Sequence, residues 1–286
     1  MEIARLDATL GAEIRGVDLS RPLDDDVFAA IERAWLEHAV LVFPDQRLSD
    51  DAHLAFTRRF GRLEQGIRRR GGRVGISRLS NVDAEGQVAP RTSLQARFLD
   101  GNTYWHSDSS YKRIGAKASI LAARVTPSEG GETEFADMRA AYDALDADMQ
   151  AWLADKVAVH SYEFSHAPFG GLEILNAEEL GHLPPVEHAV VKVHPETGRR
   201  NLFVGRHASH ILGEDPAESR ALLARLTEEG AQPPRVFAHR WRPGDLVLWD
   251  NRCVLHRGRP WPADQPRVMI RTTVAGDALD NEWAAA

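Results

Sequence analysis

Apolar residues recur along the chain with two periods, and each period predicts a different kind of element. In residues 24–40 and 50–60 they return every three or four positions, behind a run of aspartates in the first segment and Ser49 in the second. Both segments are therefore predicted to be helices. A pair of helices is predicted over 137–156, and Asp215-Pro216-Ala217-Glu218 supplies the cap, proline and glutamate that open a helix ending at Gly230.

Short β-branched or alternating segments, separated by Pro, Gly, Asn and Asp, fill most of the remaining chain. They predict strands at 41–43, 118–125, 157–160, 189–193, 201–204, 234–239, 245–249 and 267–274. Residues 195–198 are the expected turn of a hairpin between two of these strands. Many short antiparallel strands with peripheral helices favour a mainly β fold, the double-stranded β-helix or jelly roll, over a doubly wound sheet.

The chain contains no internal repeat, low-complexity tract or linker, so residues 1–286 are expected to form a single domain. The irregular, Gly- and Arg-rich region at about 66–97 is expected to be an inserted surface loop, and such loops are often binding elements. Its basic run contains Arg68, Arg69, Arg70 and Arg73. A solvated charge run is favoured there over a lid that recruits an anion.

Composition narrows the class of protein. The 286 residues are 43% hydrophobic and 27% charged, with a net charge of -7, which argues against disorder and against a nucleic-acid-binding surface. No apolar run is long enough for a membrane span and no signal-peptide pattern opens the chain, so a cytoplasmic protein is expected. The single cysteine, Cys253, cannot build a thiolate metal site, so any metal must be held by histidine and carboxylate side chains.

The segment Trp105-His106-Ser107-Asp108 offers two such ligands. On an extended strand the first and third residues of His-x-Asp point to one side, where both can reach the same ion. A second match, His194-Pro195-Glu196, falls in the predicted hairpin turn and is interpreted as a chance occurrence. With His256, the first pair makes a set of two histidines and one carboxylate, which holds Fe(II) for oxygen chemistry or Zn(II) for hydrolysis.

Two arginines near the C-terminus bear on this choice. On a strand over 267–274, Arg267 and Arg271 share one face, and buried guanidinium groups are costly unless anions meet them. A dicarboxylate ligand would supply those anions, which favours the iron chemistry. Cys253 has the opposite strand parity to His256 and is expected to pack away from the metal.

Three motifs in this order and spacing resemble one known family over nearly the whole chain. They are Tyr104-Trp105-His106-Ser107-Asp108-Ser109-Ser110, the segment from Gly130-Gly131-Glu132-Thr133 to Tyr142, and Trp249-Asp250-Asn251-Arg252-Cys253-Val254-Leu255-His256-Arg257. The sequence is similar to the Fe(II)/2-oxoglutarate dioxygenases of the taurine dioxygenase and 2,4-dichlorophenoxyacetate dioxygenase family. It is most similar to the 2,4-dichlorophenoxyacetate branch, including at His207-Ala208-Ser209-His210.

The resemblance implies three groups of site residues. The iron ligands would be His106, Asp108 and His256. The residues around 2-oxoglutarate would be Thr133, Trp249, Arg267 and Arg271, with Arg267 clamping the distal carboxylate. The residues near the substrate would be Asn102, His207 and Arg271, with His210 a weaker candidate.

The resemblance also implies a reaction. With Fe(II), 2-oxoglutarate and O2, a small organic anion would be hydroxylated, and an aryloxyalkanoate would lose its ether bond to give a phenol and an oxo acid. The same chemistry on a sulfonate, an alkyl sulfate or another carboxylate stays open. A zinc hydrolase and a non-catalytic metal-binding barrel also stay open, and relatives are commonly homodimers or homotetramers.

Overall fold

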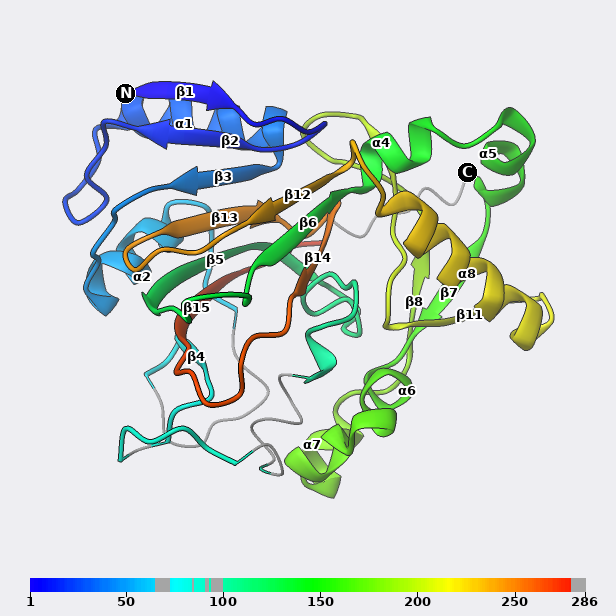
Figure 1. Ribbon diagram of the computed structural model, residues 1–286. Coiled ribbons are helices and arrows are strands. Elements are labelled where there is room, and N and C mark those ends of the chain that lie inside the picture. The colour runs from blue at the N-terminus through cyan, green and yellow to red at the C-terminus, as the bar shows by residue number, and fades with distance from the viewer. Residues whose placement is uncertain (65–72, 84, 91–92, 94–99, 279–286) are drawn as a thin grey trace.

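The computed structural model describes residues 1–64, 73–83, 85–90, 93 and 100–278 (Figure 1). Arg68, Arg69 and Arg70 lie outside the described residues. Among the described residues, no helix combines the length and the apolar character that crossing a bilayer requires.

A seven-stranded sheet dominates the described part of the chain. Its strand order is β1 (Glu2–Arg5), β2 (Ala12–Arg15), β3 (Val40–Phe43), β13 (Leu246–Asp250), β5 (Ala116–Val125), β15 (Val268–Ala275) and β4 (Ser77–Ser80). Strands β2 and β3 pair in parallel, and the other neighbours pair antiparallel. The sheet joins both ends of the chain, because N-terminal β3 lies against C-terminal β13.

The two faces of this sheet pack against different partners, as the alternation of side chains along β13 shows. Leu246 and Leu248 belong to a core shared with α1 (Asp25–His38) and α2 (Asp50–Arg58). Val247 and Trp249 point to the opposite face, into a core that includes Phe135 of the neighbouring sheet. Both faces are thus buried, which explains why these strands consist of nearly continuous apolar residues.

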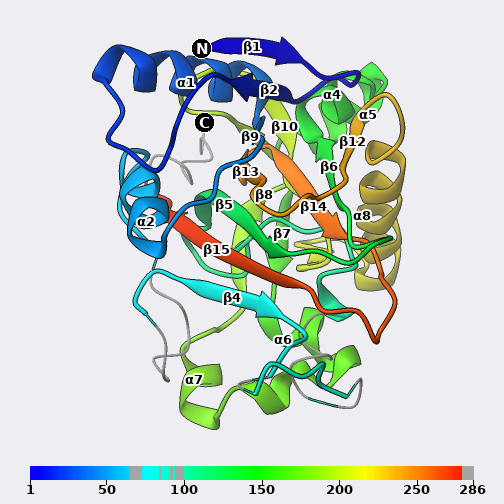
Figure 2. The same cartoon turned by 60° about the vertical axis from the view of Figure 1, so that its left-hand side comes forward.

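A three-stranded antiparallel sheet covers the second face. Its order is β12 (Val236–His239), β6 (Thr133–Asp137) and β14 (Val254–Gly258). Phe135 of β6 packs on Trp249 of β13, with 5.5 Å between the ring centroids. Figure 2 shows β6 and β14 alongside β5 and β15. The space between these two sheets contains the candidate site.

The remaining elements include two small sheets, β11 (Ala208–Ile211) with β7 (Val157–His160) and β8 (Val186–Ala189), and β9 (Val191–Val193) with β10 (Arg200–Leu202). The helices among them are α4 (Met138–Asp143), α5 (Ala147–Leu153), α6 (Tyr162–His166), α7 (Ala177–Gly181) and α8 (Pro216–Gly230), with short 3-10 turns at η1 (Ala167–Phe169) and η2 (Gly171–Ile174). Many of these elements, among them α5, α8, β7, β8 and β11, lie on the right-hand side of Figure 1, away from α2. A third core lies here, between α8, α4 and the small sheets.

The fold confirms a mainly β protein with helices, and it corrects several details of the sequence prediction. Ser49 caps α2 as predicted, accepting from the backbone N of Ala52 at 3.2 Å. The segment 189–193 is divided between β8 and β9, because the chain bends at Val190. The expected loop at 66–97 contains strand β4, which pairs with β15, so the prediction was wrong at residues 77–80. In the same region, Arg73 forms an ion pair with Asp51.

Candidate active site

The two histidines of the predicted metal set are joined through their backbones. His106 N donates to His256 O at 3.0 Å, and His256 N donates to His106 O at 2.8 Å. This isolated bridge attaches the His106 segment to the edge of β14 and is followed by a turn that carries Asp108. The expectation of an extended strand at 105–108 was therefore wrong, although the turn still brings Asp108 back to the histidines.

His106, Asp108 and His256 form a buried group suited to one metal ion. Each offers a ligand atom, and these atoms all lie within 4.8 Å of one another. The Nδ1 atom of His106 lies 2.8 Å from the carbonyl oxygen of Tyr104 and must carry a proton, because the carbonyl can only accept. The Nε2 atom therefore has a free lone pair, as a metal-ligating imidazole requires.

The charge state of these side chains also fits a metal. Burial lowers the pKa of His256 to about 4, and burial together with the His256 and Arg206 charges lowers the pKa of His106 well below its usual value. Burial opposes ionisation of Asp108, but Arg271 and the two histidines outweigh it and lower the pKa of that carboxyl. At neutral pH the group presents two neutral imidazoles and one carboxylate, which suits Fe(II).

Asp108 is held by residues that the sequence did not single out. Ser119 Oγ donates to Asp108 Oδ2 at 2.7 Å, and Asn251 Nδ2 donates in turn to Ser119 Oγ at 2.9 Å. The Oδ1 atom of Asn251 accepts from Asp108 N at 3.2 Å and from Trp249 Nε1 at 2.9 Å. Asn251 thus links the metal carboxylate to strands β5 and β13. The sequence offered one indication that Asn251 belongs to the site, because it follows Trp249 and Asp250 in the third motif.

A pocket of ≈ 570 Å³ opens beside the two histidines. Its walls come from both facing sheets and from two loops, and its lining includes most of the predicted site residues. The lining residues are Leu79, Asn102, Thr103, His106, Leu121, Thr133, Trp249, His256, Gly258, Arg259, Trp261, Arg267 and Arg271. The structure therefore brings together Asn102, Thr133, Trp249, Arg267 and Arg271 with the candidate metal ligands.

Arg267 is a buried cation in this pocket. Among the described residues, no carboxylate lies within ion-pair distance of it, and its Nε atom has no hydrogen-bond partner. Its Nη2 atom donates to the carbonyl of Gly131 at 3.2 Å, and the guanidinium lies over Trp261. Burial lowers the pKa of Arg267 to about 10, so the side chain stays charged at neutral pH.

Gly131 makes room for this arginine. It has a φ of +71°, and a Cβ atom there would stand 3.3 Å from Arg267 Nε. Glycine is the residue that adopts this backbone conformation without strain. The Gly130-Gly131 pair before Thr133 thus has a local structural role beside the guanidinium.

Arg271 differs from Arg267 because a protein carboxylate also meets it, although its buried Nε atom has no hydrogen-bond partner and its expected contacts with 2-oxoglutarate and substrate stay predictions. Its Nη1 atom donates to Asp108 Oδ1 at 2.7 Å, so a protein carboxylate already meets this cation. The two arginines also do not share one regular strand face, because β15 begins at Val268 and its register shifts between Val268 and Met269.

His207 and His210 lie outside the lining of this pocket. The ring of His207 is 6.2 Å from that of His106, in an edge-to-face arrangement. His210 is partly exposed on β11, and its Nδ1 atom is 2.9 Å from Ser209 Oγ. The structure therefore places His207, and not His210, next to the candidate metal ligands.

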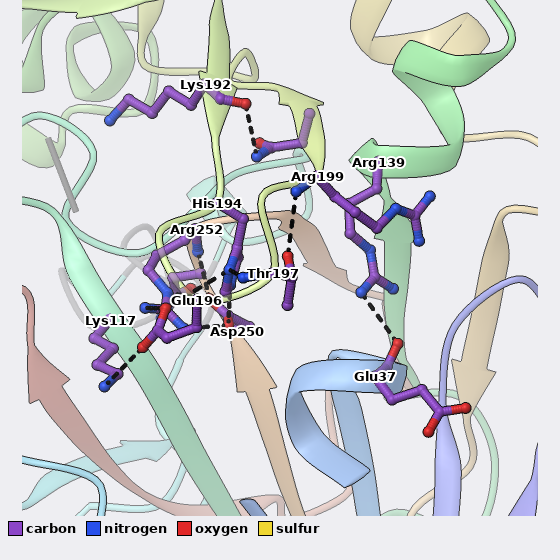
Figure 3. Close-up of polar contacts among 12 residues, drawn as sticks. Glu37, Lys117, Arg139, Lys192, His194, Glu196, Thr197, Arg199, Asp250 and Arg252 are labelled. Carbon is purple, nitrogen blue, oxygen red and sulfur yellow. Dashed lines mark hydrogen bonds and ion pairs between the residues drawn. The ribbon is translucent and has the colours of Figure 1, made fainter. Parts of the chain in front are cut away.

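His194 belongs to a separate buried ion network (Figure 3). Its Nε2 atom is 3.0 Å from Asp250 Oδ2, and its Nδ1 atom accepts from Thr197 N at 3.2 Å. The Arg252 guanidinium donates hydrogen bonds to both carboxylate oxygens of Asp250, from Nε at 2.8 Å and from Nη2 at 2.7 Å. Its Nη1 atom donates to Glu196 Oε2 at 2.6 Å. His194 thus lies apart from the group of His106, Asp108 and His256, and its contact with Asp250 gives it a structural role.

Cys253 lies near this network, and burial raises the pKa of its thiol. It packs in the apolar core with Val254 and Trp249, which confirms the predicted packing role. The strand-parity argument for it was wrong, because residues 251–253 form a turn before β14 begins.

Comparison with known proteins settles the family. Residues 2–273 match the family described as "Taurine catabolism dioxygenase TauD, TfdA family". The chain belongs to this dioxygenase family. It is 45% identical over 283 residues to an (S)-phenoxypropionate/alpha-ketoglutarate-dioxygenase of Sphingobium herbicidovorans, covering 96% of this chain and 95% of the relative.

Two further relatives are similar to this chain over nearly its full length. An alpha-ketoglutarate-dependent 2,4-dichlorophenoxyacetate dioxygenase of Cupriavidus pinatubonensis is 43% identical, covering 94% of this chain and 95% of the relative. The crystal structure of AAD-2 in complex with Mn(II) and N-oxalylglycine aligns with a TM-score of 0.89 at 40% identity, covering 96% of this chain and 98% of AAD-2.

Proposed function

We propose that this protein is an Fe(II)- and 2-oxoglutarate-dependent dioxygenase that oxidises an aryloxyalkanoate. One observation carries the proposal. The buried group of two histidines and one carboxylate opens onto a pocket whose inner cation, Arg267, lacks a carboxylate partner among the described residues. A metal that needs a chelating co-substrate and a cation that needs an anion are thus adjacent.

His106, Asp108 and His256 would hold the iron. When bound, Fe(II) together with 2-oxoglutarate and O2 supplies the oxidising power. The chain contributes the orientation of the ligands: the Tyr104 carbonyl fixes the proton of His106 on Nδ1, and Ser119 with Asn251 fixes the carboxylate of Asp108. Among the described residues, the absence of a thiolate from this group disfavours a structural zinc site.

Arg267 and Thr133 would bind the distal carboxylate of 2-oxoglutarate. A guanidinium binds a carboxylate through two parallel hydrogen bonds, which a lysine cannot reproduce. Trp249 would form a wall of the same pocket, because its ring packs 4.7 Å from that of His256. Arg271 would stabilise the negative charge around the metal through its contact with Asp108.

The relatives named above act on phenoxypropionate and 2,4-dichlorophenoxyacetate by name, and their identity to this chain extends over nearly its full length. An aryloxyalkanoate would be hydroxylated at the carbon between its ether oxygen and its carboxylate. The resulting hemiacetal releases the phenol when its C–O ether bond breaks, and the new hydroxyl becomes the carbonyl of the oxo acid. Asn102 lines the pocket and is a candidate substrate contact.

The proposal extends to the organisation of the protein. The three-stranded sheet facing the large sheet supports a double-stranded β-helix, or jelly roll, built as a single domain over residues 1–286. We also propose a cytoplasmic location and a homodimer or homotetramer. Light scattering of the purified protein measures the oligomeric state directly.

A panel of anions tests the function. The purified protein with Fe(II) and 2-oxoglutarate is expected to consume O2 and form succinate together with a phenol when phenoxyacetates or 2-phenoxypropionates are added. Arg267→Lys is expected to raise the KM for 2-oxoglutarate about 10-fold or more, because the bidentate contact is lost. If no carboxylate, sulfonate or sulfate ester stimulates the formation of succinate, the proposed enzymatic function is contradicted. Hydrolysis supported by Zn(II) alone would favour the hydrolase instead.

A further inference from the structure

Asn81 stands opposite Arg267, where the pairing between β4 and β15 ends. Val268 pairs with Ser80 in an antiparallel register. The next pair along the two segments is therefore Arg267 with Asn81, and the backbone N of Asn81 donates to Arg267 O at 3.3 Å. Asn81 belongs to none of the three sequence motifs, and it falls in the region at about 66–97 that was expected to be a loop.

The side chain of Asn81 supplies the return hydrogen bond of this last pair. Arg267 N donates to Asn81 Oδ1 at 2.7 Å, and Asn81 Nδ2 donates to Gln265 O at 2.9 Å. A backbone N–H can only donate and a carbonyl can only accept, so both atoms of the side-chain amide are assigned by their partners. The carbonyl of Asn81 is used elsewhere, because it accepts from Ala89 N at 2.7 Å. One amide group thus holds both ends of the segment 265–267.

This segment lies outside the regular pairing of β15. Pro266 stands between the two residues that Asn81 contacts, and proline has no N–H to donate. Strand β15 begins at Val268, and its register against β5 shifts between Val268 and Met269. Asn81 and Arg267 are each only 8% exposed, so water has little access to take over these hydrogen bonds. The contacts of Asn81 therefore fix the backbone of Arg267 where the strand ladder does not.

The same segment also supports the guanidinium of Arg267. Gln265 O accepts a second hydrogen bond, from Trp261 Nε1 at 3.2 Å. The guanidinium of Arg267 lies over the ring of Trp261, 5.1 Å from its centroid, and both residues line the pocket. Asn81 and Trp261 thus meet at one carbonyl oxygen. This shared acceptor ties the backbone of Arg267 to the aromatic surface that its charged group contacts.

We propose that Asn81 is a positioning residue for the binding of 2-oxoglutarate and acts through Arg267. The inference rests on the proposed function, which assigns the distal carboxylate of the co-substrate to Arg267. A contact of two parallel hydrogen bonds between guanidinium and carboxylate depends on the direction of the guanidinium as well as on its charge. Asn81 holds the backbone from which that side chain extends, and it does not itself line the pocket. Its loss is therefore expected to weaken the binding of the distal carboxylate alone.

Binding of two matched ligands to the protein loaded with Mn(II) tests the proposal without turnover. 2-Oxopentanoate has the 2-oxo acid group of 2-oxoglutarate but ends in a methyl group where 2-oxoglutarate has its distal carboxylate. Calorimetric titration of the wild type is expected to show a preference of about 10- to 100-fold for 2-oxoglutarate. Asn81→Ala is expected to weaken 2-oxoglutarate about 5- to 10-fold, because Arg267 is no longer pre-organised. The affinity for 2-oxopentanoate should change less than about twofold.

A variant of the arginine shows whether Asn81 acts through it. Arg267→Met removes the guanidinium but keeps the backbone N that donates to Asn81 Oδ1. In this background Asn81→Ala is expected to change the affinity for 2-oxoglutarate less than about twofold, because the group that it positions is absent. An undiminished effect of Asn81→Ala in the Arg267→Met background would overturn the proposal. Equal weakening of the two ligands by Asn81→Ala alone would overturn it as well.

Two further variants separate positioning from a general effect on the fold. Gln87→Ala changes an exposed residue of the segment that follows β4 and is expected to leave both affinities unchanged. Asn81→Ser is a milder change that takes the place of Asn81→Ala if the latter does not fold. A loss of affinity confined to 2-oxoglutarate in Asn81→Ser supports the proposal, and an unchanged preference between the two ligands contradicts it.

Failure of this inference is distinguishable from failure of the proposed function. A wild-type protein without a preference for 2-oxoglutarate over 2-oxopentanoate would contradict the assignment of Arg267, and the proposed function with it. A wild-type preference that Asn81→Ala retains in full would leave the function standing and overturn the role of Asn81. A preference that Asn81→Ala reduces, and that Arg267→Met abolishes, supports both.

Discussion

Trp241 donates from its indole Nε1 to the hydroxyl oxygen of Thr133 at 2.9 Å. A threonine hydroxyl has one proton and two acceptor positions, and the indole occupies one of the acceptors. The proton of Thr133 is therefore left to donate, and Thr133 lines the pocket that also contains Arg267. Trp241 itself is buried against His239, with 4.6 Å between the rings, and is not part of the lining.

Replacing Trp241 is expected to weaken the binding of 2-oxoglutarate, although Trp241 does not itself line the pocket. Trp241→Phe should raise the KM for 2-oxoglutarate about fivefold with a smaller change in kcat, since one neutral hydrogen bond contributes about 1 kcal/mol. Steady-state kinetics at saturating organic substrate measures the KM for 2-oxoglutarate and kcat separately. Thr133→Val should have a similar effect, and the double variant should add little, because both changes disrupt the same contact. Fully additive effects would show that Trp241 does not act through Thr133.

Asn251 is expected to tune metal affinity although it is not a ligand. Asn251→Ala removes the acceptor for Asp108 N and the donor to Ser119 Oγ, so the carboxylate loses its orientation. Groups that support a metal ligand in this way typically contribute about 10- to 100-fold to affinity. Equilibrium dialysis with Mn(II) is expected to show a loss of that size.

Ser119→Ala provides a second variant for the same idea, because it removes the hydroxyl that donates to Asp108 Oδ2. An intermediate loss of Mn(II) affinity is expected. The Tm of each metal-free variant shows whether the fold is preserved. Wild-type metal affinity in a folded Asn251→Ala protein would contradict the supporting role.

The helices of the fold were predictable because their signals are local. In α8, Asp215 caps the helix by accepting from Ala217 N and Glu218 N, each at 2.9 Å, and Pro216 stands at its first position. The candidate metal ligands His106 and Asp108 could be predicted for a related reason, since both belong to one short motif. In each case the interacting residues are close in sequence.

The strands and site residues that were not predicted depend on contacts between segments that are far apart in the sequence. Strands β6 and β14 carry Thr133 and His256 but are short and rich in polar residues, so their apolar alternation was too weak to predict them. The bond between Arg271 and Asp108 joins residues 163 positions apart.

Stability is expected to fall as the pH is lowered below about 6.5, in part through His53. This side chain is fully buried, and burial lowers its pKa to about 4. A group whose pKa is depressed in the folded state stabilises the fold above the unfolded pKa, and this contribution declines as pH falls toward the folded pKa. For His53 the window runs from about 6.5 down to about 4.

The size of this effect can be measured by urea unfolding of the metal-free protein at several pH values. Between pH 7.5 and 5.5 His53 should contribute a loss of about 1.4 kcal/mol in the free energy of unfolding. His53→Gln should therefore show a shallower decline than the wild type, whatever its absolute stability. His182→Gln, which changes an exposed histidine, should reproduce the wild-type slope. Parallel slopes for His53→Gln and wild type would contradict the prediction.

Breaking the buried network of Asp250 is expected to lower the stability of the protein substantially (Figure 3). Asp250 and Arg252 are both buried, and the Arg252 guanidinium contributes strongly to the lowered pKa of the Asp250 carboxyl. Arg252→Met would leave that carboxylate with His194 as its remaining side-chain partner among the described residues. An uncompensated buried charge typically costs about 3–5 kcal/mol, so a loss of this size is expected in the free energy of unfolding.

The partners of Arg252 provide the controls for this experiment. Glu196→Gln removes a partly exposed member of the network and is expected to cost about 1 kcal/mol or less. Combining Arg252→Met with Asp250→Asn should recover part of the loss, because no buried carboxylate is then left without its guanidinium. Urea unfolding at neutral pH measures all three variants. A double variant less stable than Arg252→Met would show that the arginine acts through its packing rather than through the charge of Asp250.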